Sequence, residues 1–185
     1  MKKILFAVIA LITISGVNRA EAQAPVTPPV SFYSLSFKTI DGEDFKFEQL
    51  KNKMVLIVNT ASKCGYTSQY AGLEELSKQY KNKLVVIGFP SNDFGAQEPG
   101  SNAEIKSFCE SKYNVTFLLM DKSSVKGSEK NAVYKWLTEK SRNGWNEVEP
   151  SWNFNKYLID ENGRLIAHFP SKTTPTGSEI ISKLK

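Results

Sequence analysis

The chain has 185 residues, of which 41% are hydrophobic, 11% aromatic and 23% charged, and its formal net charge is +5. This is the composition of one globular domain, which argues against a disordered protein or a multidomain assembly. The lysines are interspersed with acidic residues and form no dense block, so the chain lacks the clustered cations of a nucleic-acid-binding surface.

Residues 1–22 predict a secretory signal peptide. Two lysines precede an apolar run over residues 4–14, and the sequence Ala-Glu-Ala that ends at Ala22 offers a cleavage site before Gln23. The apolar run is too short to span a bilayer comfortably, and no second run follows it. No cysteine stands at the cleavage site to carry a lipid anchor. We therefore expect a soluble protein, periplasmic or secreted after cleavage near Ala22, with no stable insertion in the membrane.

Residues 23–30 contain three prolines and predict a short extended arm, which leads into one domain over residues 31–185. Alternating side chains over 31–37 and 44–47, separated by an Asp-Gly turn, predict an amino-terminal β-hairpin. Residues 53–59 are almost all apolar and rich in β-branched side chains. This pattern is typical of a strand that is covered on both faces.

A β-α-β unit follows, because residues 67–81 have helical periodicity and residues 84–89 form the next apolar strand. A capping box at 101–104 predicts a second helix that runs through about residue 113. The remaining predicted elements are a strand over 115–120, a helix over 129–140, a hairpin of strands 155–160 and 164–169, and a helix from about 176. This order describes an α/β thioredoxin-like sandwich with a central mixed sheet, an amino-terminal hairpin and helices on both faces.

The two cysteines, Cys64 and Cys109, are too far apart for a Cys-x-x-Cys redox motif. The single histidine, His168, lies in a strand-like segment and is interpreted as a surface or edge residue. Since the ligands of the usual zinc and haem sites are missing, we expect no metal and no other cofactor. An even number of cysteines in an exported chain leaves a structural disulfide open.

Cys64 lies in the connection between the strand 53–59 and the helix 67–81. Ligands of open α/β sheets gather at the carboxyl ends of strands, where helix N termini direct free N–H groups outward. A thiol in this place meets a partial positive charge that favours the thiolate, and Lys63 adds to it. We interpret Cys64 as a nucleophile, and a buried or disulfide-bonded cysteine is the alternative.

Neutral hydrogen-bond donors follow two other strands at the same edge of the predicted sheet. Gln97 lies in a loop rich in Gly and Pro after the strand 84–89, and Trp152 and Asn153 precede the strand 155–160. Such donors stabilise a sulfur anion without protonating it. Taken singly, these residues have structural alternatives: a loop-capping amide, a core aromatic side chain and a turn-forming residue.

Three segments resemble the signatures of the glutathione peroxidase family, in the family's order: NTASKCGYT at 59–67, FPSNDFGAQEPGSN at 89–102 and WNFNKYLIDENG at 152–163. The resemblance runs from about residue 31 to the carboxyl end. It implies a thioredoxin-like fold and reduction of hydrogen peroxide or organic hydroperoxides. It also implies roles for individual residues, with Cys64 as the peroxidatic nucleophile and Gln97, Trp152 and Asn153 as its hydrogen-bonding partners.

The sequence departs from many family members at two positions, with Ser91 in place of a further cysteine and Asp93 in place of glutamine. Neither position belongs to the four site residues. Cys64 in place of selenocysteine resembles most bacterial members. The short segment before Trp152 resembles the branch that reduces phospholipid hydroperoxides, which implies a monomer.

Cys109 resembles the resolving cysteine of family members that use thioredoxin-like reductants. Ile105, Phe108 and Cys109 also form an apolar helix face, so a buried helix thiol is the alternative. We expect a thiol peroxidase that is recycled by a thioredoxin-like protein or glutathione as its thiol co-substrate. The other candidates are a non-catalytic thioredoxin-fold domain with a permanent Cys64–Cys109 disulfide and a general thiol-disulfide oxidoreductase.

Overall fold

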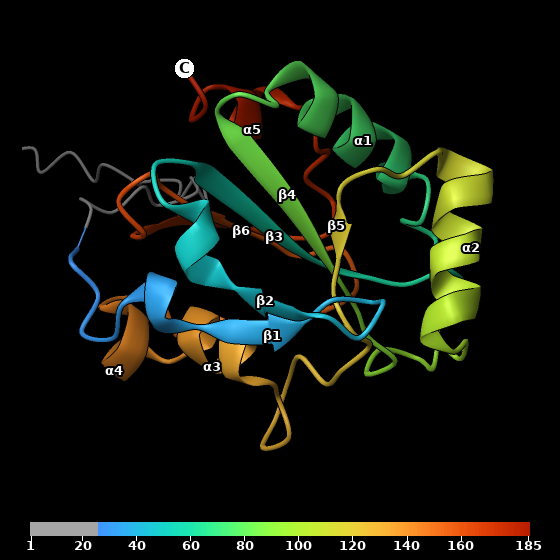
Figure 1. The fold of residues 1–185 in the computed structure, drawn as a ribbon, viewed down its shortest axis with the longest axis horizontal. Coiled ribbons are helices and arrows are strands. Elements are labelled where there is room, and N and C mark those ends of the chain that lie inside the picture. The colour runs from blue at the N-terminus through green and yellow to red at the C-terminus, as the bar shows by residue number, and fades with distance from the viewer. Residues whose placement is uncertain (1–25) are drawn as a thin grey trace, which may run out of the picture.

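A computed structural model describes residues 26–185, which fold around a five-stranded sheet with the strand order β5-β4-β3-β6-β7 (Figure 1). β3 is parallel to β4 and β4 to β5, whereas β6 runs antiparallel to both of its neighbours, β3 and β7. The sheet is therefore mixed, which confirms the prediction. The strands are β3 (Met54–Thr60), β4 (Leu84–Pro90), β5 (Leu118–Leu119), β6 (Lys156–Ile159) and β7 (Leu165–Phe169).

A separate two-stranded hairpin precedes the sheet, formed by β1 (Ser36–Lys38) and β2 (Asp44–Lys46). The predicted signal peptide lies outside the described residues, as does the beginning of the predicted arm. The part of the arm that is described ends against the domain, because the Val30 carbonyl accepts the indole N–H of Trp136 at 2.7 Å. The helices are α1 (Gln69–Gln79), α2 (Asn102–Tyr113), α3 (Ala132–Thr138), α4 (Lys140–Asn143) and α5 (Ser178–Ile181).

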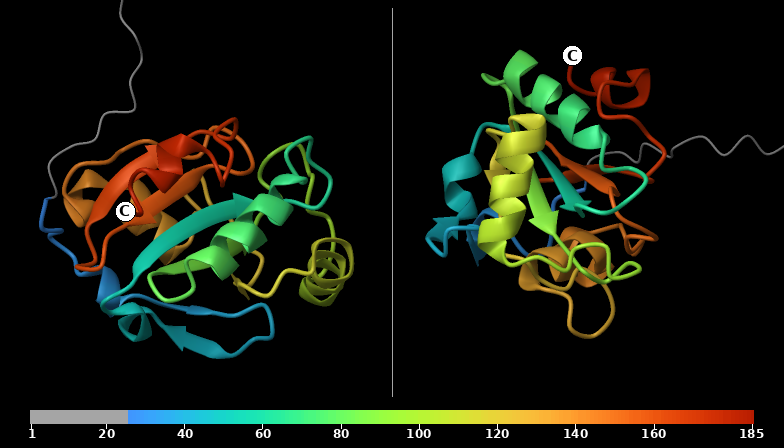
Figure 2. Two further views of the ribbon diagram at one scale, coloured as in Figure 1. Left: turned by 90° about the horizontal axis from the view of Figure 1, so that it is seen from above. Right: turned by 90° about the vertical axis from the view of Figure 1, so that its right-hand side faces the viewer.

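Every residue of β3 is buried, because both faces of the sheet are covered. Leu56 and Val58 belong to an apolar cluster with side chains of α1, α2 and α5. Val55 and Ile57 point to the opposite face and belong to a second cluster with side chains of α3 and the segment around the hairpin. The alternation expected for a strand thus divides the core into two clusters, one on each side of the sheet. Figure 2 shows the helices that pack around the sheet.

Several predicted boundaries are wrong for local reasons. Residues 32–34 form a 3₁₀ turn instead of extended strand, since the Phe32 ring is turned inward onto Phe47 and Trp136. The third helix begins at Ala132 because the side chain of Asn131 caps it. The predicted strand over 115–120 is reduced to two residues. The second helix has the predicted capping box of Ser101 and Glu104.

His168 lies on the edge strand β7, as predicted for an edge residue, and its ring is only partly exposed. The ring packs on Tyr157 with centroids 4.8 Å apart, and Nε2 lies 3.0 Å from Oδ1 of Asn155. Burial lowers the pKa of His168 to about 4. The imidazole is therefore neutral in the folded protein at physiological pH.

This geometry predicts that acid destabilises the fold through His168. Between pH 6.5 and about 4 the unfolded chain binds a proton that the folded chain does not, so stability is complete above this window. It falls by up to about 3 kcal/mol as the pH drops through the window. Urea unfolding of the wild type and His168→Asn at several pH values checks this. Because the chain has one histidine, its pKa can also be read directly by NMR. Parallel pH profiles of the two proteins would contradict it.

Candidate functional site

Cys64 lies in the turn between β3 and α1, at the carboxyl end of the central strand. Thr67 holds this turn, because its hydroxyl donates to the Ala61 carbonyl at 2.9 Å and accepts the Cys64 N–H at 3.0 Å. Cys64 is 9% exposed, and its Sγ accepts the N–H of Tyr66 at 3.4 Å. The helix begins only at Gln69, later than predicted. The backbone donor to the sulfur is therefore a turn amide and not an amide of the first helical turn.

Gln97 lies in the loop between β4 and α2, which crosses the same edge of the sheet. The chain turns sharply just before it, since Gly95 and Ala96 have positive φ values of 63° and 51°. The Gln97 carbonyl accepts the N–H of Lys63 at 3.0 Å. This hydrogen bond joins the loop to the residue directly before Cys64.

Trp152 and Asn153 precede β6, whose first residues pair with the end of β3. The side chain of Asn59, in β3, donates to the Trp152 carbonyl at 2.9 Å, and the Asn59 carbonyl accepts the N–H of Phe154 at 2.6 Å. From the other side, the Ser171 hydroxyl donates to the Asn153 carbonyl at 2.6 Å. The backbone of this segment is thus fixed by hydrogen bonds from two neighbouring segments.

The side chains of Gln97 and Asn153 contact each other, with Asn153 Nδ2 donating to Gln97 Oε1 at 3.0 Å. The Trp152 ring packs on Phe94, in the loop that carries Gln97, with centroids 5.8 Å apart, and is 39% exposed. The structure therefore brings the three proposed partners together beside the Cys64 turn. In the described part of the chain, none of them donates a hydrogen bond to Sγ. Their action on the sulfur stays a prediction.

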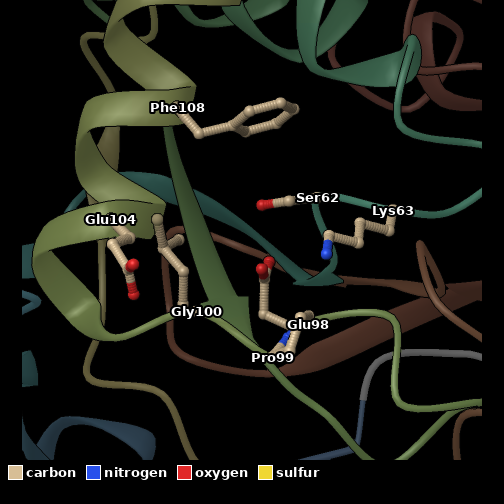
Figure 3. A pocket seen from close by; sticks show the side chains of 8 residues that line it. Ser62, Lys63, Glu98, Pro99, Gly100, Glu104 and Phe108 are labelled. Atoms are coloured by element: carbon tan, nitrogen blue, oxygen red, sulfur yellow. The ribbon is translucent and has the colours of Figure 1, made fainter.

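A cavity of about 350 Å³ lies between the residues that precede Cys64 and helix α2 (Figure 3). Ser62 and Glu98 point into it from two loops, and Phe108 extends over it from the helix. Glu98 is 1% exposed, and burial raises its pKa. Within the described residues, Glu98 Oε2 and Ser62 Oγ have no hydrogen-bond partner. The cavity therefore has a buried carboxyl group at the boundary between the two elements that carry the cysteines.

Cys109 is fully buried on the inner side of α2. Both cysteines are free thiols, and both belong to the apolar cluster beneath α1 and α2. Burial raises the pKa of the Cys109 thiol to about 11, and the carboxylates of Glu98 and Glu110 act in the same direction. Cys109 is therefore protonated and shielded at neutral pH. The disulfide between Cys64 and Cys109 that the non-catalytic alternative requires is not formed in this structure.

The sequence did not single out several residues that hold the site. Asn59 ends an apolar strand, and its burial is suggested only by that position. Glu98 directly follows Gln97 and is indistinguishable from an exposed loop carboxylate in the sequence. Ser171 belongs to a segment without periodicity, so only the fold shows that it reaches Asn153.

Residues 26–185 contain no group of three His, Cys, Asp or Glu side chains that could hold a metal ion. The helices of this part of the chain also lack the length and apolar character that crossing a membrane requires. The chemistry available at the site is that of a thiol among neutral polar side chains, with a buried carboxyl group nearby.

Comparison with known proteins identifies relatives along most of the chain. The family model described as glutathione peroxidase matches residues 32–138. The glutathione peroxidase-like peroxiredoxin GPX5 of Chlamydomonas reinhardtii is 49% identical over 145 residues, which cover 78% of this chain and 89% of the relative. The hydroperoxy fatty acid reductase Gpx2 of Synechocystis sp. is 44% identical over 146 residues, which cover 78% and 91% of the two chains.

A solved structure also matches the fold of this chain. The crystal structure of Trgpx in apo form matches with a TM-score of 0.64 at 35% identity, covering 84% of this chain and 93% of that one. The thioredoxin-like fold that the sequence predicts is thereby confirmed. By its sequence, its fold and the assembly of residues around Cys64, this chain belongs to the glutathione peroxidase family.

Proposed function

We propose that the protein is a thiol peroxidase that reduces hydrogen peroxide and organic hydroperoxides, lipid hydroperoxides included, through Cys64. One observation carries the proposal: a free thiol lies in a turn that is hydrogen-bonded to the Gln97 loop, and Gln97 is bonded in turn to Asn153. The relatives named as a peroxiredoxin and as a hydroperoxy fatty acid reductase support the same chemistry.

The first half of the cycle follows from the reactivity of sulfur and the weak O–O bond. The Cys64 thiolate attacks one peroxide oxygen, the O–O bond breaks, and the other oxygen leaves as water or alcohol after taking a proton. Cys64 becomes a sulfenic acid. The Oδ1 atom of Asn153 is buried and has no partner in the described residues. It is an acceptor suited to the O–H group of a hydroperoxide, which would orient the O–O bond at the site.

The second half uses Cys109 as the resolving thiol in our proposal. Its sulfur attacks the Cys64 sulfenic acid, a disulfide forms, and the hydroxyl group leaves as water with the proton of the thiol. A disulfide needs Cα atoms within about 7 Å, and Cys109 is fully buried on α2, so we propose that α2 opens locally when the disulfide forms. Only two side chains of α2, Ile105 and Cys109, are buried, which makes local opening of this helix comparatively inexpensive.

The other properties that we propose rest on the sequence. The predicted signal peptide over residues 1–22 supports an exported, periplasmic or secreted protein, and the resemblance of the short segment before Trp152 to the monomeric branch of the family supports a monomer. A thioredoxin-like protein is the preferred reductant in this proposal, and glutathione is the slower one. The disulfide-bonded, non-catalytic alternative has no support from the structure, in which both cysteines are free.

The decisive prediction concerns the two cysteines. Reduced wild-type protein is expected to lose one thiol rapidly and stoichiometrically when hydrogen peroxide is added, and then a second as the disulfide closes. Cys64→Ser removes the rapid reaction, because Cys109, the other thiol, is buried and has a raised pKa. Cys109→Ser retains it but accumulates sulfenic and then sulfinic acid. Stopped-flow thiol titration and mass spectrometry measure these steps. Equal peroxide reactivity of the wild type and Cys64→Ser would reject the function.

A second prediction tests the neutral donors. Asn153→Ala removes both the bond to Gln97 and the buried acceptor, so the second-order constant for Cys64 oxidation should fall by about 100-fold. The comparison is Asn162→Ala, an exposed amide in the β6–β7 turn that should react like the wild type. An Asn153→Ala protein that is folded and reacts at the wild-type rate would show that the amide has no part in the reaction.

A third prediction concerns the reductant. Peroxide turnover should be faster with a thioredoxin-like protein than with glutathione, because a dithiol protein reduces a Cys64–Cys109 disulfide in a single encounter. Steady-state assays with each reductant measure the ratio. The preference should disappear in Cys109→Ser. If the variant and the wild type turn over at the same rate with the thioredoxin-like protein, Cys109 is not the resolving cysteine.

A further inference from the structure

Lys156 is a fully buried lysine near the end of β3, on the side of the sheet where the site lies. It is the first residue of β6 and pairs with Val58, near the end of β3. Asn153, three residues earlier, is bonded to Gln97. A buried lysine thus lies close in the chain to the proposed catalytic Asn153, and the peroxidase chemistry described above does not use it.

Three neutral oxygen atoms accept hydrogen bonds from the Lys156 ammonium group. They are Oε1 of Gln69 at the start of α1 and the backbone carbonyls of Ser171 and Thr173, the latter at 2.5 Å. This set matches the three N–H donors of a charged lysine. The ammonium therefore joins three separate segments of the chain: α1, β6 and residues 171–173.

The position is costly for a charged group. Burial lowers the pKa of Lys156 to about 7, since no bulk water solvates the ion. Apolar residues at buried ionic positions often give equal or higher stability, so packing alone does not account for a lysine here. His168, which bonds to the neighbouring Asn155, is neutral and adds no charge to this layer at neutral pH.

The hydrogen bonds of Lys156 continue directly to the proposed catalytic segment. Its ammonium and the side chain of Gln69 both donate to the Ser171 carbonyl. The hydroxyl of Ser171 donates to the Asn153 carbonyl at 2.6 Å and accepts Nδ2 of Asn155 at 3.0 Å. Each link is a short polar contact in a buried region, so a displacement of residue 171 moves the backbone of Asn153.

We propose that Lys156 is a positioning residue for the reaction at Cys64, which it serves by holding Ser171 and, through the Ser171 hydroxyl, the backbone of Asn153. The inference rests on the proposed peroxidase function. Without the ammonium, Thr173 loses its hydrogen bond to β6, and the Ser171 carbonyl keeps only the hydrogen bond from Gln69. Ser171, which donates to the Asn153 carbonyl, is then held less firmly, and we expect the Asn153 amide to shift relative to Gln97 and the incoming peroxide. A misplacement of about 1 Å is enough to slow such a reaction by about 100-fold.

The test separates the peroxide step from the reduction step. We expect Lys156→Met, which keeps the length of the side chain, to lower the second-order constant for oxidation of Cys64 by hydrogen peroxide by about 30-fold. Reduction of the oxidised protein by dithiothreitol should change by less than about 2-fold, because that step does not require the Asn153 amide. The matched control is Lys46→Met, an exposed lysine on β2, which should retain both constants.

Ser171→Ala is the second variant, and it tests the link even if Lys156→Met does not fold. It removes the hydroxyl bond to Asn153 and leaves Lys156 in place, so the peroxide constant should fall by about 5-fold. Because both side chains act through one link, the double variant should be no slower than Lys156→Met.

Several results would overturn the inference. The first is an unchanged peroxide constant in folded Lys156→Met or in Ser171→Ala. The second is an equal loss of the peroxide constant and the dithiothreitol constant, which indicates lost folded protein. The third is additive effects of the two substitutions in the double variant. A wild-type protein that does not react with peroxide would instead reject the proposed function itself. The two failures are therefore distinguishable.

Discussion

The site depends on hydrogen bonds that join three loops at one edge of the sheet. The Lys63 N–H is bonded to the Gln97 carbonyl, and the Asn153 amide is bonded to the Gln97 side chain. The three loops follow β3, follow β4 and precede β6, so the parallel and antiparallel pairings of the central strands bring them together. Neutral amides next to a sulfur stabilise negative charge only if they are held in place, since free amides would turn toward water. The framework of the sheet meets this requirement.

Polar side chains extend the β3–β6 ladder beyond its last backbone pair. Asn59 bonds to the N–H of Asn155 through Oδ1 and to the Trp152 carbonyl through Nδ2, and its own carbonyl accepts the Phe154 N–H. These bonds hold Phe154 at a φ of 62°, a conformation unfavourable for a residue with a side chain. This local strain turns the chain so that Trp152 and Asn153 face the Gln97 loop, and the buried amides around it offset its cost.

The sequence predicts what periodicity and spacing determine. The apolar strand 53–59, the helix predicted over 67–81 and the capping box at Ser101 each give an element of the right type, and their order gives the sandwich. Cys64 is found because a cysteine stands where a buried strand ends.

Lys156 and Ser171 could not be found in this way, because a lysine in a strand is usually exposed and a serine in a loop has many roles. Their function depends on contacts between residues far apart in the sequence. The inward Phe32 and the shortened strand β5 likewise reflect packing, which overrides local pattern.

The two cysteines occupy environments with different physical consequences. Cys64 lies in a turn, is 9% exposed and has a backbone amide on its sulfur, whereas Cys109 is fully buried in a helix and has a pKa of about 11. A resolving thiol that was ionised and exposed would itself react with peroxide, so burial protects it from oxidation. The burial that protects Cys109 from peroxide would also keep it from the Cys64 sulfenic acid unless α2 can open. The helix is closed at its start by the capping box, which contributes about 1 kcal/mol, and at its end by the left-handed Asn114, but only two of its side chains, Ile105 and Cys109, are buried. The two caps stabilise the closed state of α2, and because its buried face is small, the free energy of local opening is low.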